Sequence, residues 1–217
     1  MSIVTLERKI LKKNDEIAAE NRKLFLEREI FTINLLSSPG SGKTSLLEQT
    51  LARLANHIQI AVVEGDVQTD KDAQRIAKYN IPVVQIITNG GCHLEAQLIQ
   101  NALGNFDLNA LNALIIENVG NLVCPANYDL GESKKVVLIS TTEGDDKPLK
   151  YPAMFHVSDV MIINKMDLLN YVDFDVTTVK ENAYRINPDL KIIETSCRTG
   201  QGIDQWMNWL YTQIKIT

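Results

Sequence analysis

The feature that most constrains this chain is the run Ser37–Thr44, which follows an apolar segment and leads directly into a helical pattern. In the order strand, loop, helix, glycines let backbone N–H groups surround a phosphate, and the helix N-terminus adds a positive dipole end. Lys43 is expected to reach the β- and γ-phosphates, and the Thr44 hydroxyl to hold Mg²⁺. Ser37 replaces the first glycine of the strict P-loop pattern, but the later glycines, lysine and threonine remain. The expected phosphate-binding residues are Pro39, Gly40, Ser41, Gly42, Lys43, Thr44 and Ser45.

Short apolar runs alternate with helical patterns through the rest of the chain. The expected strands are Phe31–Ser37, Ile58–Glu64, Pro82–Ile87, Ala113–Glu117, Lys135–Thr141, Asp159–Asn164 and Lys191–Glu194. The expected helices are Lys43–Asn56, Thr69–Tyr79, His93–Leu103, Thr177–Asn187 and Gln201–Ile214. Most strand runs are apolar at consecutive positions, which is typical of parallel strands covered on both faces. This order predicts an α/β fold with a doubly wound, mostly parallel sheet of the P-loop NTPase type, and ligands beyond the carboxyl ends of its strands.

A second motif, Asn164–Asp167, ends the sixth expected strand about 120 residues after the P-loop. The Asp167 carboxylate can accept hydrogen bonds from both the ring N1–H and the exocyclic amine of guanine, whereas adenine offers no such pair. Sites built on such hydrogen bonds reject an analogue by about 10⁴–10⁵. The later run Ser196–Gly200 resembles the loop that supports guanine through backbone N–H groups. We therefore expect Asn164, Lys165, Asp167, Ser196 and Cys197 to bind the base, with Cys197 away from any metal.

Two acidic strand ends complete the expected nucleotide site. Glu64-Gly65-Asp66 closes the second strand, and Glu117 precedes Gly120 with the spacing of the acid-x-x-Gly switch. Thr44, Asp66 and Glu117 are the expected Mg²⁺ residues, and Lys43, Asp66, Glu117 and Gly120 are the expected catalytic residues. The next residue is Asn121 rather than a water-positioning glutamine, which predicts slow intrinsic hydrolysis that depends on a partner chain or on Asp66. Lys147 is either a charge supplied to the γ-phosphate across a dimer or an exposed loop lysine.

Residues before the first strand form a separate pattern. Leu6, Ile10 and Ile17 recur at helical spacing between Thr5 and Arg28, a stretch without Gly or Pro. We expect an N-terminal amphipathic helix over residues 1–30 and a single P-loop GTPase domain over residues 31–217.

Cys92, His93 and Cys124 are the candidate metal ligands. Cys92 and His93 follow the third expected strand, and Cys124 lies shortly after Gly120, so both segments should emerge on the nucleotide side of the sheet. Thiolates and imidazole suit Zn²⁺ or Ni²⁺. Because one chain offers three such ligands, water or a second chain related by a two-fold axis would complete a four-ligand site. The residues alone also allow buried structural cysteines and a histidine in a first helical turn.

Composition excludes several other classes. The net charge of -5 argues against binding to a nucleic-acid backbone, and no apolar run approaches the length of a membrane span. Three widely spaced cysteines make a poor disulfide framework, so reduced thiols and a cytoplasmic location are expected.

Five runs together resemble the hydrogenase nickel-incorporation GTPases, the HypB family. They are Leu36–Thr44, Glu64–Asp66, Gly90–Leu94, Glu117–Pro125 and Glu143–Pro148. The resemblance covers nearly the whole chain, and the Glu117–Pro125 run is more specific than any P-loop.

The resemblance implies a GTPase that delivers nickel to the large subunit of [NiFe]-hydrogenase. It also implies a nucleotide-dependent homodimer and a small zinc-containing maturation partner. The family's metal ligands fall on Cys92, His93 and Cys124, and its nucleotide residues on Lys43, Thr44, Asp66, Glu117, Asn164, Lys165 and Asp167. Residues 1–30 contain neither Cys nor His, so the additional N-terminal nickel site of some members is not expected.

Three other functions fit the motifs less well. A urease-type nickel chaperone would carry Cys-Pro-His, whereas Cys92 and His93 are adjacent here. A GTP-dependent switch that remodels a partner without metal would leave both cysteines in the core. A P-loop kinase would not need Asn164–Asp167.

The spacing also predicts how nucleotide and metal communicate. Cys124 lies seven residues after Glu117 on one continuous segment, so γ-phosphate contacts that order Gly120 should reposition the thiol. Nucleotide and metal would then change each other's affinity by the same factor. Metal binding should also weaken below about pH 6 as His93 takes up a proton.

Overall fold

The computed structural model describes residues 3–54, 57–68 and 71–214. Within them, seven strands form one sheet in the order β3-β2-β4-β1-β5-β6-β7. The strands are β1 (Phe31–Ser37), β2 (Ile60–Asp66), β3 (Val83–Ile87), β4 (Ala113–Glu117), β5 (Lys134–Ser140), β6 (Val160–Asn164) and β7 (Lys191–Glu194). Every neighbouring pair is parallel, so all the carboxyl ends lie at one edge. The predicted doubly wound sheet is confirmed.

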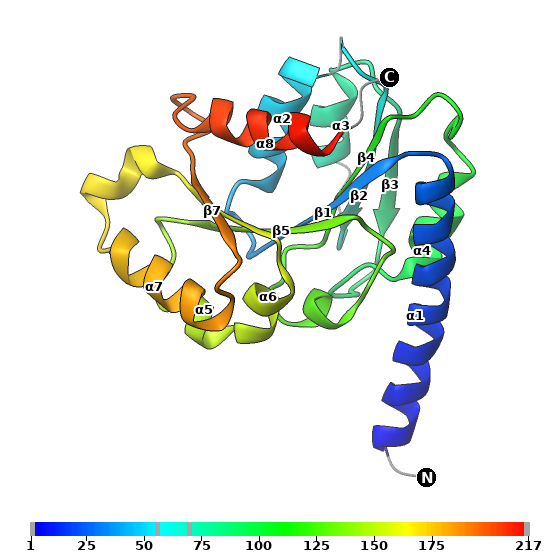
Figure 1. Ribbon diagram of the computed structural model, residues 1–217, viewed down its shortest axis with the longest axis horizontal. Helices are drawn as coiled ribbons and strands as arrows, with labels where there is room; N and C mark the ends of the chain where they lie inside the picture. Colours follow the sequence, from blue (N-terminus) through cyan, green and yellow to red (C-terminus); the bar gives the residue numbers. More distant parts are fainter. Residues whose placement is uncertain (1–2, 55–56, 69–70, 215–217) are drawn as a thin grey trace.

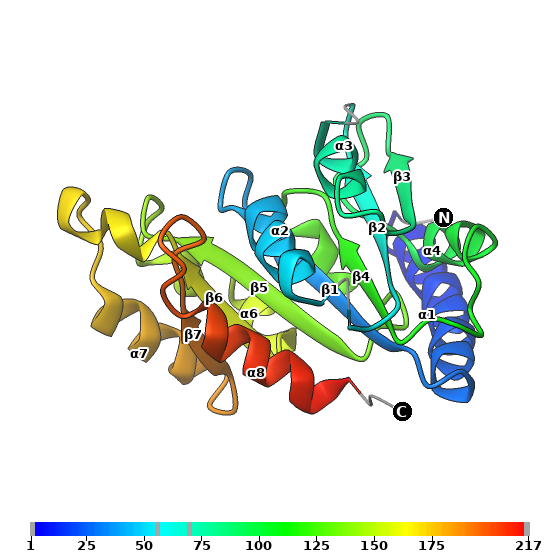
Figure 2. The ribbon, with the colours of Figure 1, turned by 90° about the horizontal axis from the view of Figure 1, so that it is seen from above.

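Helices cover both faces of the sheet (Figures 1 and 2). They are α1 (Ile3–Glu27), α2 (Lys43–Leu54), α3 (Lys71–Ala77), α4 (Ala96–Leu103), α5 (Lys147–Lys150), α6 (Pro152–Val157), α7 (Val176–Ile186) and α8 (Ile203–Gln213), with 3₁₀ turns η1 (Cys124–Asn127) and η2 (Met166–Tyr171). Apolar side chains of α2, α3 and α8 pack against one face. Those of α1, α4, α6 and α7 pack against the other. Because the central strands are buried on both sides, they are apolar at consecutive positions.

The expected strands are found within about two residues of their bounds. The expected helix end at Asn56 and helix start at Thr69 lie outside the described residues. The helix expected from His93 begins later. His93 lies outside α4, which starts at Ala96 after an extended Glu95. The backbone N–H of Leu94 donates to the Asn118 side chain instead of entering a helix. The spacing of apolar residues is helical from His93 onward in the sequence, but the contact with Asn118 keeps the segment before Ala96 out of the helix. The short helices α5 and α6 were not expected, and each has a proline in its first turn.

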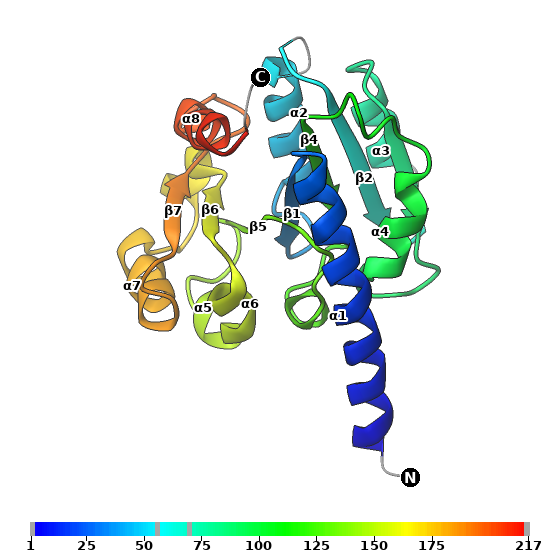
Figure 3. The same ribbon diagram turned by 45° about the vertical axis from the view of Figure 1, so that its right-hand side comes forward.

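The leading helix α1 packs along α4, and its own side chains Ala18 and Phe25 are fully buried. Its amino-terminal part extends past the rest of the domain (Figure 3). Asn14 and Asn21 are also buried and form hydrogen bonds to segments more than seventy residues away. No helix in the described part of the chain is long and apolar enough to cross a bilayer.

Candidate functional site: a nucleotide cavity beside a thiol–imidazole cluster

The P-loop joins β1 to α2 and depends on two glycines with positive φ. Gly40 has φ +77 and Gly42 has φ +101. A Cβ on Gly42 would lie 2.4 Å from Nδ2 of Asn164, so the base-reading strand end contacts the loop where only glycine fits. Asn164 also donates to the Ser41 carbonyl at 3.0 Å. The phosphate and base motifs therefore form one continuous site.

Lys43 and Thr44 begin α2, beneath the P-loop. Nζ of Lys43 donates to Oγ of Ser37 at 2.9 Å, which gives a role to the serine that replaces the first glycine. Burial lowers the pKa of Lys43, although the surrounding carboxylates, Glu117 first, oppose this shift. Oγ1 of Thr44 donates to Glu117 at 2.8 Å. Bound phosphates would supply the negative charge that this buried lysine needs.

The P-loop and the ends of β2 and β4 line a cavity of about 480 Å³. Of the predicted residues, it is lined by Pro39, Gly40, Gly42, Lys43, Thr44, Ser45, Asp66, Glu117, Gly120 and Lys165. Ser41 instead turns inward, and its hydroxyl donates to Glu143 at 2.6 Å. A Cβ on Gly120 would lie 3.1 Å from Cα of Pro39, so the switch glycine touches the P-loop directly.

Three carboxylates meet inside this cavity. Oxygen atoms of Glu64, Asp72 and Glu117 lie within 4.8 Å of one another. Burial, followed by repulsion from Glu117 and Asp66, raises the pKa of Glu64 to about 8. Burial raises the pKa of Glu117 to about 7, against the opposing charge of Lys43.

This cluster fits Mg²⁺ because buried carboxylate oxygens remain free for it. Oε2 of Glu64 and Oε2 of Glu117 have no hydrogen-bond partner among the described residues. Asp66 lines the same cavity, so the structure adds Glu64 and Asp72 to the predicted acids. Sequence analysis missed Asp72 because it lies on α3, where an acid in the first turn indicates only a stable helix.

The candidate base site is a second cavity of about 340 Å³ that shares Gly42, Ser45 and Lys165 with the first. Four of the five residues expected to bind the base line it: Asn164, Lys165, Asp167 and Cys197. Lys165 has φ +61, and its Nζ donates to the Gly40 carbonyl at 2.7 Å, so it reaches across the P-loop.

The loop after β7 is tied to the base-reading motif. Ser196 does not line the base cavity, but its Oγ donates to Asp167 at 2.5 Å. Burial raises the pKa of Cys197 to about 11, and its backbone N–H and thiol both face Oδ1 of Asn164. Cys197 lines the base cavity and is not part of the cluster formed by Cys92, His93 and Cys124.

Glu143 and Lys147 form a second support for the P-loop that sequence analysis did not identify. Nζ of Lys147 lies 3.0 Å from Glu143 and 3.2 Å from Oγ of Ser38. Burial raises the pKa of Glu143, but hydrogen bonds from Ser38, Ser41 and Lys147 outweigh it and leave this pKa below its ordinary value. In this structure Lys147 faces its own P-loop, and it is largely buried rather than an exposed loop residue.

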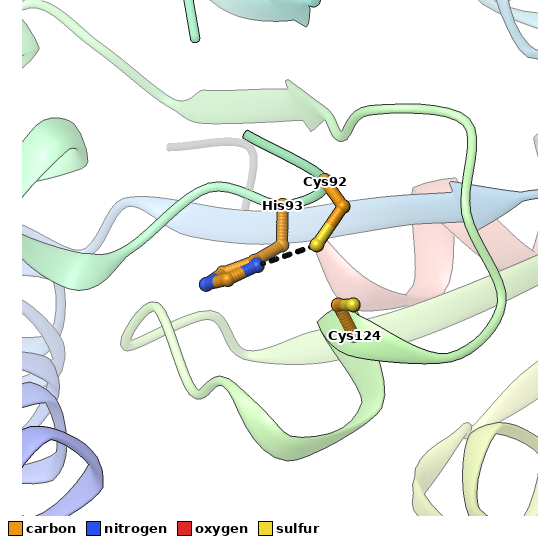
Figure 4. A group of neighbouring side chains, drawn as sticks. All are labelled: Cys92, His93 and Cys124. Carbon is orange, nitrogen blue, oxygen red and sulfur yellow. Dashed lines mark hydrogen bonds between the residues drawn. The ribbon is translucent and has the colours of Figure 1, made fainter. Parts of the chain in front are cut away.

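The three candidate metal ligands converge from two loops (Figure 4). One ligand atom each from Cys92, His93 and Cys124 lies within 4.8 Å of the others. Sγ of Cys92 lies 3.4 Å from Nδ1 of His93. The Tyr128 ring packs on the imidazole, with ring centroids 3.7 Å apart, so the loop that carries Cys124 also orients His93.

The protonation of this cluster suits a soft divalent cation. Contact with Cys124 and burial raise the pKa of Cys92, so its thiol is protonated without a metal. Burial lowers the pKa of His93 despite Glu95, which leaves the imidazole neutral at pH 7. Neutral imidazole and thiols that lose protons on binding form a set typical of Ni²⁺ or Zn²⁺.

Comparison with known proteins assigns this arrangement to a class. Residues 31–194 match the CobW/HypB/UreG nucleotide-binding domain. The hydrogenase maturation factor HypB of Azotobacter vinelandii is 52% identical over 211 residues, which cover 97% of this chain and 70% of that protein. The crystal structure of HypB from Archaeoglobus fulgidus has a TM-score of 0.87 at 40% identity, covering 93% of this chain and 98% of that one.

A second crystal structure, of HypB from Helicobacter pylori in complex with nickel, has a TM-score of 0.85 at 39% identity. The match covers 94% of this chain and 99% of the Helicobacter pylori chain. The chain therefore belongs to the HypB family of hydrogenase maturation factors.

Proposed function

We propose that this protein binds and hydrolyses GTP and carries nickel to the large subunit of a [NiFe]-hydrogenase. The observation that carries the proposal is the convergence of Cys92, His93 and Cys124 within 4.8 Å, beside the nucleotide cavity. Cys124 lies on the segment that continues from Gly120 in the cavity wall. Nickel in the Helicobacter pylori relative supports the choice of cargo.

The residues divide the nucleotide chemistry among them. Asp167 and Asn164 read guanine, and Lys43 with the P-loop amides holds the phosphates. Thr44, Asp66 and Glu117, together with Glu64 and Asp72, would hold Mg²⁺, which neutralises charge on the β- and γ-phosphates. The catalytic set is Lys43, Asp66, Glu117 and Gly120.

Hydrolysis is expected to be slow without a partner. The Asn121 side chain accepts a hydrogen bond from the backbone of Val123, so it faces its own loop rather than an attacking water. Asp66 lines the nucleotide cavity and is proposed to orient that water.

The metal cluster is proposed to exchange its cargo with partner proteins. One chain supplies three soft ligands, so a two-fold dimer formed with bound nucleotide can complete the coordination. The proposed partners are a small zinc-containing maturation protein and the hydrogenase large subunit. We also propose a cytoplasmic location, because free thiols at Cys92, Cys124 and Cys197 fit a reducing compartment.

The test is nickel titration of the purified protein, paired with measurement of GTP hydrolysis. Cys124→Ala should lower nickel affinity by more than the about 10–100-fold typical of losing an outer-shell partner. Cys197→Ala is the matched control, because it removes a thiol beside the base and should leave nickel affinity intact. Equal nickel binding by the wild type and Cys124→Ala would refute the metal site. Absence of GTP hydrolysis would refute the enzymatic half.

A further inference from the structure

Leu94, the residue after His93, is held by groups on both sides of the nucleotide cavity. Its backbone N–H donates to Oδ1 of Asn118 at 3.1 Å. Its side chain is fully buried and fills the space beside Gly65, where an added Cβ would lie 2.8–2.9 Å from it. Gly65 and Asn118 both line the nucleotide cavity. The loop that carries Cys92 and His93 therefore rests directly on the walls of that cavity.

The Asn118 side chain is shared between this loop and the switch segment. Its Oδ1 also accepts the backbone N–H of Val119 at 2.9 Å, so one oxygen binds both segments. Asn118 is only 1% exposed, so loss of either bond would leave a buried polar group without its partner. A displacement of Val119 and Gly120 toward a γ-phosphate must therefore change the contact with Leu94.

The other end of Asn118 is fixed to the sheet. Its Nδ2 donates to Oδ1 of Asn34 at 3.2 Å, and its backbone N–H donates to the Leu35 carbonyl in β1. Nδ2 of Asn34 donates in turn to Glu132 at 3.0 Å. These buried partners hold the carboxamide in one orientation. When the Val119 N–H moves away, Oδ1 of Asn118 is left to the Leu94 N–H alone, and its contact with the Cys92–His93 loop changes.

We propose that Asn118 is the positioning residue through which the nucleotide state moves the Cys92–His93 loop. This route branches from the chain between Glu117 and Cys124 through the Asn118 side chain and leads to the other loop. The inference rests on the proposed function, because the property it transmits is metal affinity. With both routes acting, the Cys92–His93 loop and the segment that carries Cys124 both respond to the γ-phosphate.

The first experiment needs no metal. Hydrogen exchange at the Leu94 amide is measured in the metal-free protein with GDP and with a non-hydrolysable GTP analogue. The exchange rate in the wild type should differ several-fold between the two nucleotides, and Asn118→Ser should exchange fast and equally in both. Identical protection of Leu94 in both states of the wild type would overturn the inference.

The second experiment measures the ratio of nickel affinities in the same two nucleotide states. We expect a ratio of about 5-fold or more in the wild type, and a clear fall toward 1 in Asn118→Ala. Asn118→Ser serves as the second variant, with thermal unfolding reporting whether each one folds. Asn187→Ala is the matched control, because its carboxamide makes long-range bonds to the carbonyls of Phe155 and Ser158.

The outcomes separate the two proposals. An unchanged ratio in Asn118→Ala, or a wild-type ratio of 1, overturns the coupling while leaving the metal site in place. A wild type that binds no nickel overturns the proposed metal function and the metal half of this inference, and the exchange experiment still decides the nucleotide half.

Discussion

At the base site, single atomic contacts restrict which residue types can be present. The close approach of Gly42 to Nδ2 of Asn164 leaves room for no side chain at position 42. The proposed reading of guanine requires a carboxylate at Asp167. Such requirements leave little choice of side chain, so the pattern is recognisable without the fold.

Asp167→Asn should shift selectivity from guanine to xanthine nucleotides. Xanthine carries a carbonyl where guanine has its exocyclic amine, so an asparagine amide can donate where the aspartate accepted. In competition binding, the wild type should prefer GDP over XDP, and the variant should prefer XDP over GDP. Asp189→Asn, an exposed change near the start of β7, is the control. Retained preference for GDP would contradict the base-reading role of Asp167.

The buried acids predict how stability varies with pH. Because folding raises the pKa of Glu64 from 4.5 to about 8, the folded protein binds this proton more tightly. Unfolding free energy of the nucleotide-free protein should therefore fall as pH rises across this range, by up to about 1.4 kcal/mol per unit for one proton. Glu64→Gln should flatten the slope, measured by denaturant unfolding at several pH values. A slope as steep in the variant would contradict the assignment.

Other site residues could not be found from sequence because they act through tertiary contacts. Glu64 was visible as a strand-end acid, but only the fold brings it to Asp72 and Glu117. Glu143 reaches Ser41 across 102 residues, and no local spacing marks that pair. The metal ligands were suggested by residue type and resemblance, and the structure adds their convergence.

At the scale of elements, α1 connects the start of α4, which follows the Cys92–His93 loop, to the segment after η1, which begins at Cys124. Nδ2 of Asn21 donates at 3.0 Å to the carbonyls of both Ala96 and Leu130. Asn14 accepts the Ala96 N–H and donates to the Asp129 carbonyl. The amphipathic pattern predicted this helix, but polar residues on its inner face gave no sign that they join distant loops.

Asn21→Ala should lower the free energy of unfolding by about 1–3 kcal/mol, because two buried carbonyls lose their donor. Lys23→Ala, on the exposed side of the same helix, should stay within about 0.5 kcal/mol. Denaturant unfolding followed by circular dichroism measures both. Equal stability of the two variants would show that α1 is held by its apolar contacts alone.

Across the whole molecule, the parallel sheet brings both cavities and the metal cluster to one edge. The strand patterns predicted this edge because parallel strands end on the same side. The start of α4 and the short helices α5 and α6 were not predictable, since contacts from other segments set their bounds.

Binding of a GTP analogue with Mg²⁺ should favour a homodimer over the monomer. The switch glycine touches the P-loop, so a γ-phosphate there would reorder the segment that leads to Cys124. Sedimentation velocity should show a doubled mass with the analogue and a monomer with GDP. A monomer in both states would contradict nucleotide-dependent association.

The opposite edge of the sheet, where strands begin, is the place to attach a probe. Asp189 is exposed there, just before β7. A fluorophore or surface tether attached at this position would lie at the end of the sheet opposite the nucleotide and metal sites. The nucleotide cycle of a single immobilised molecule could then be followed without contact between the label and either ligand.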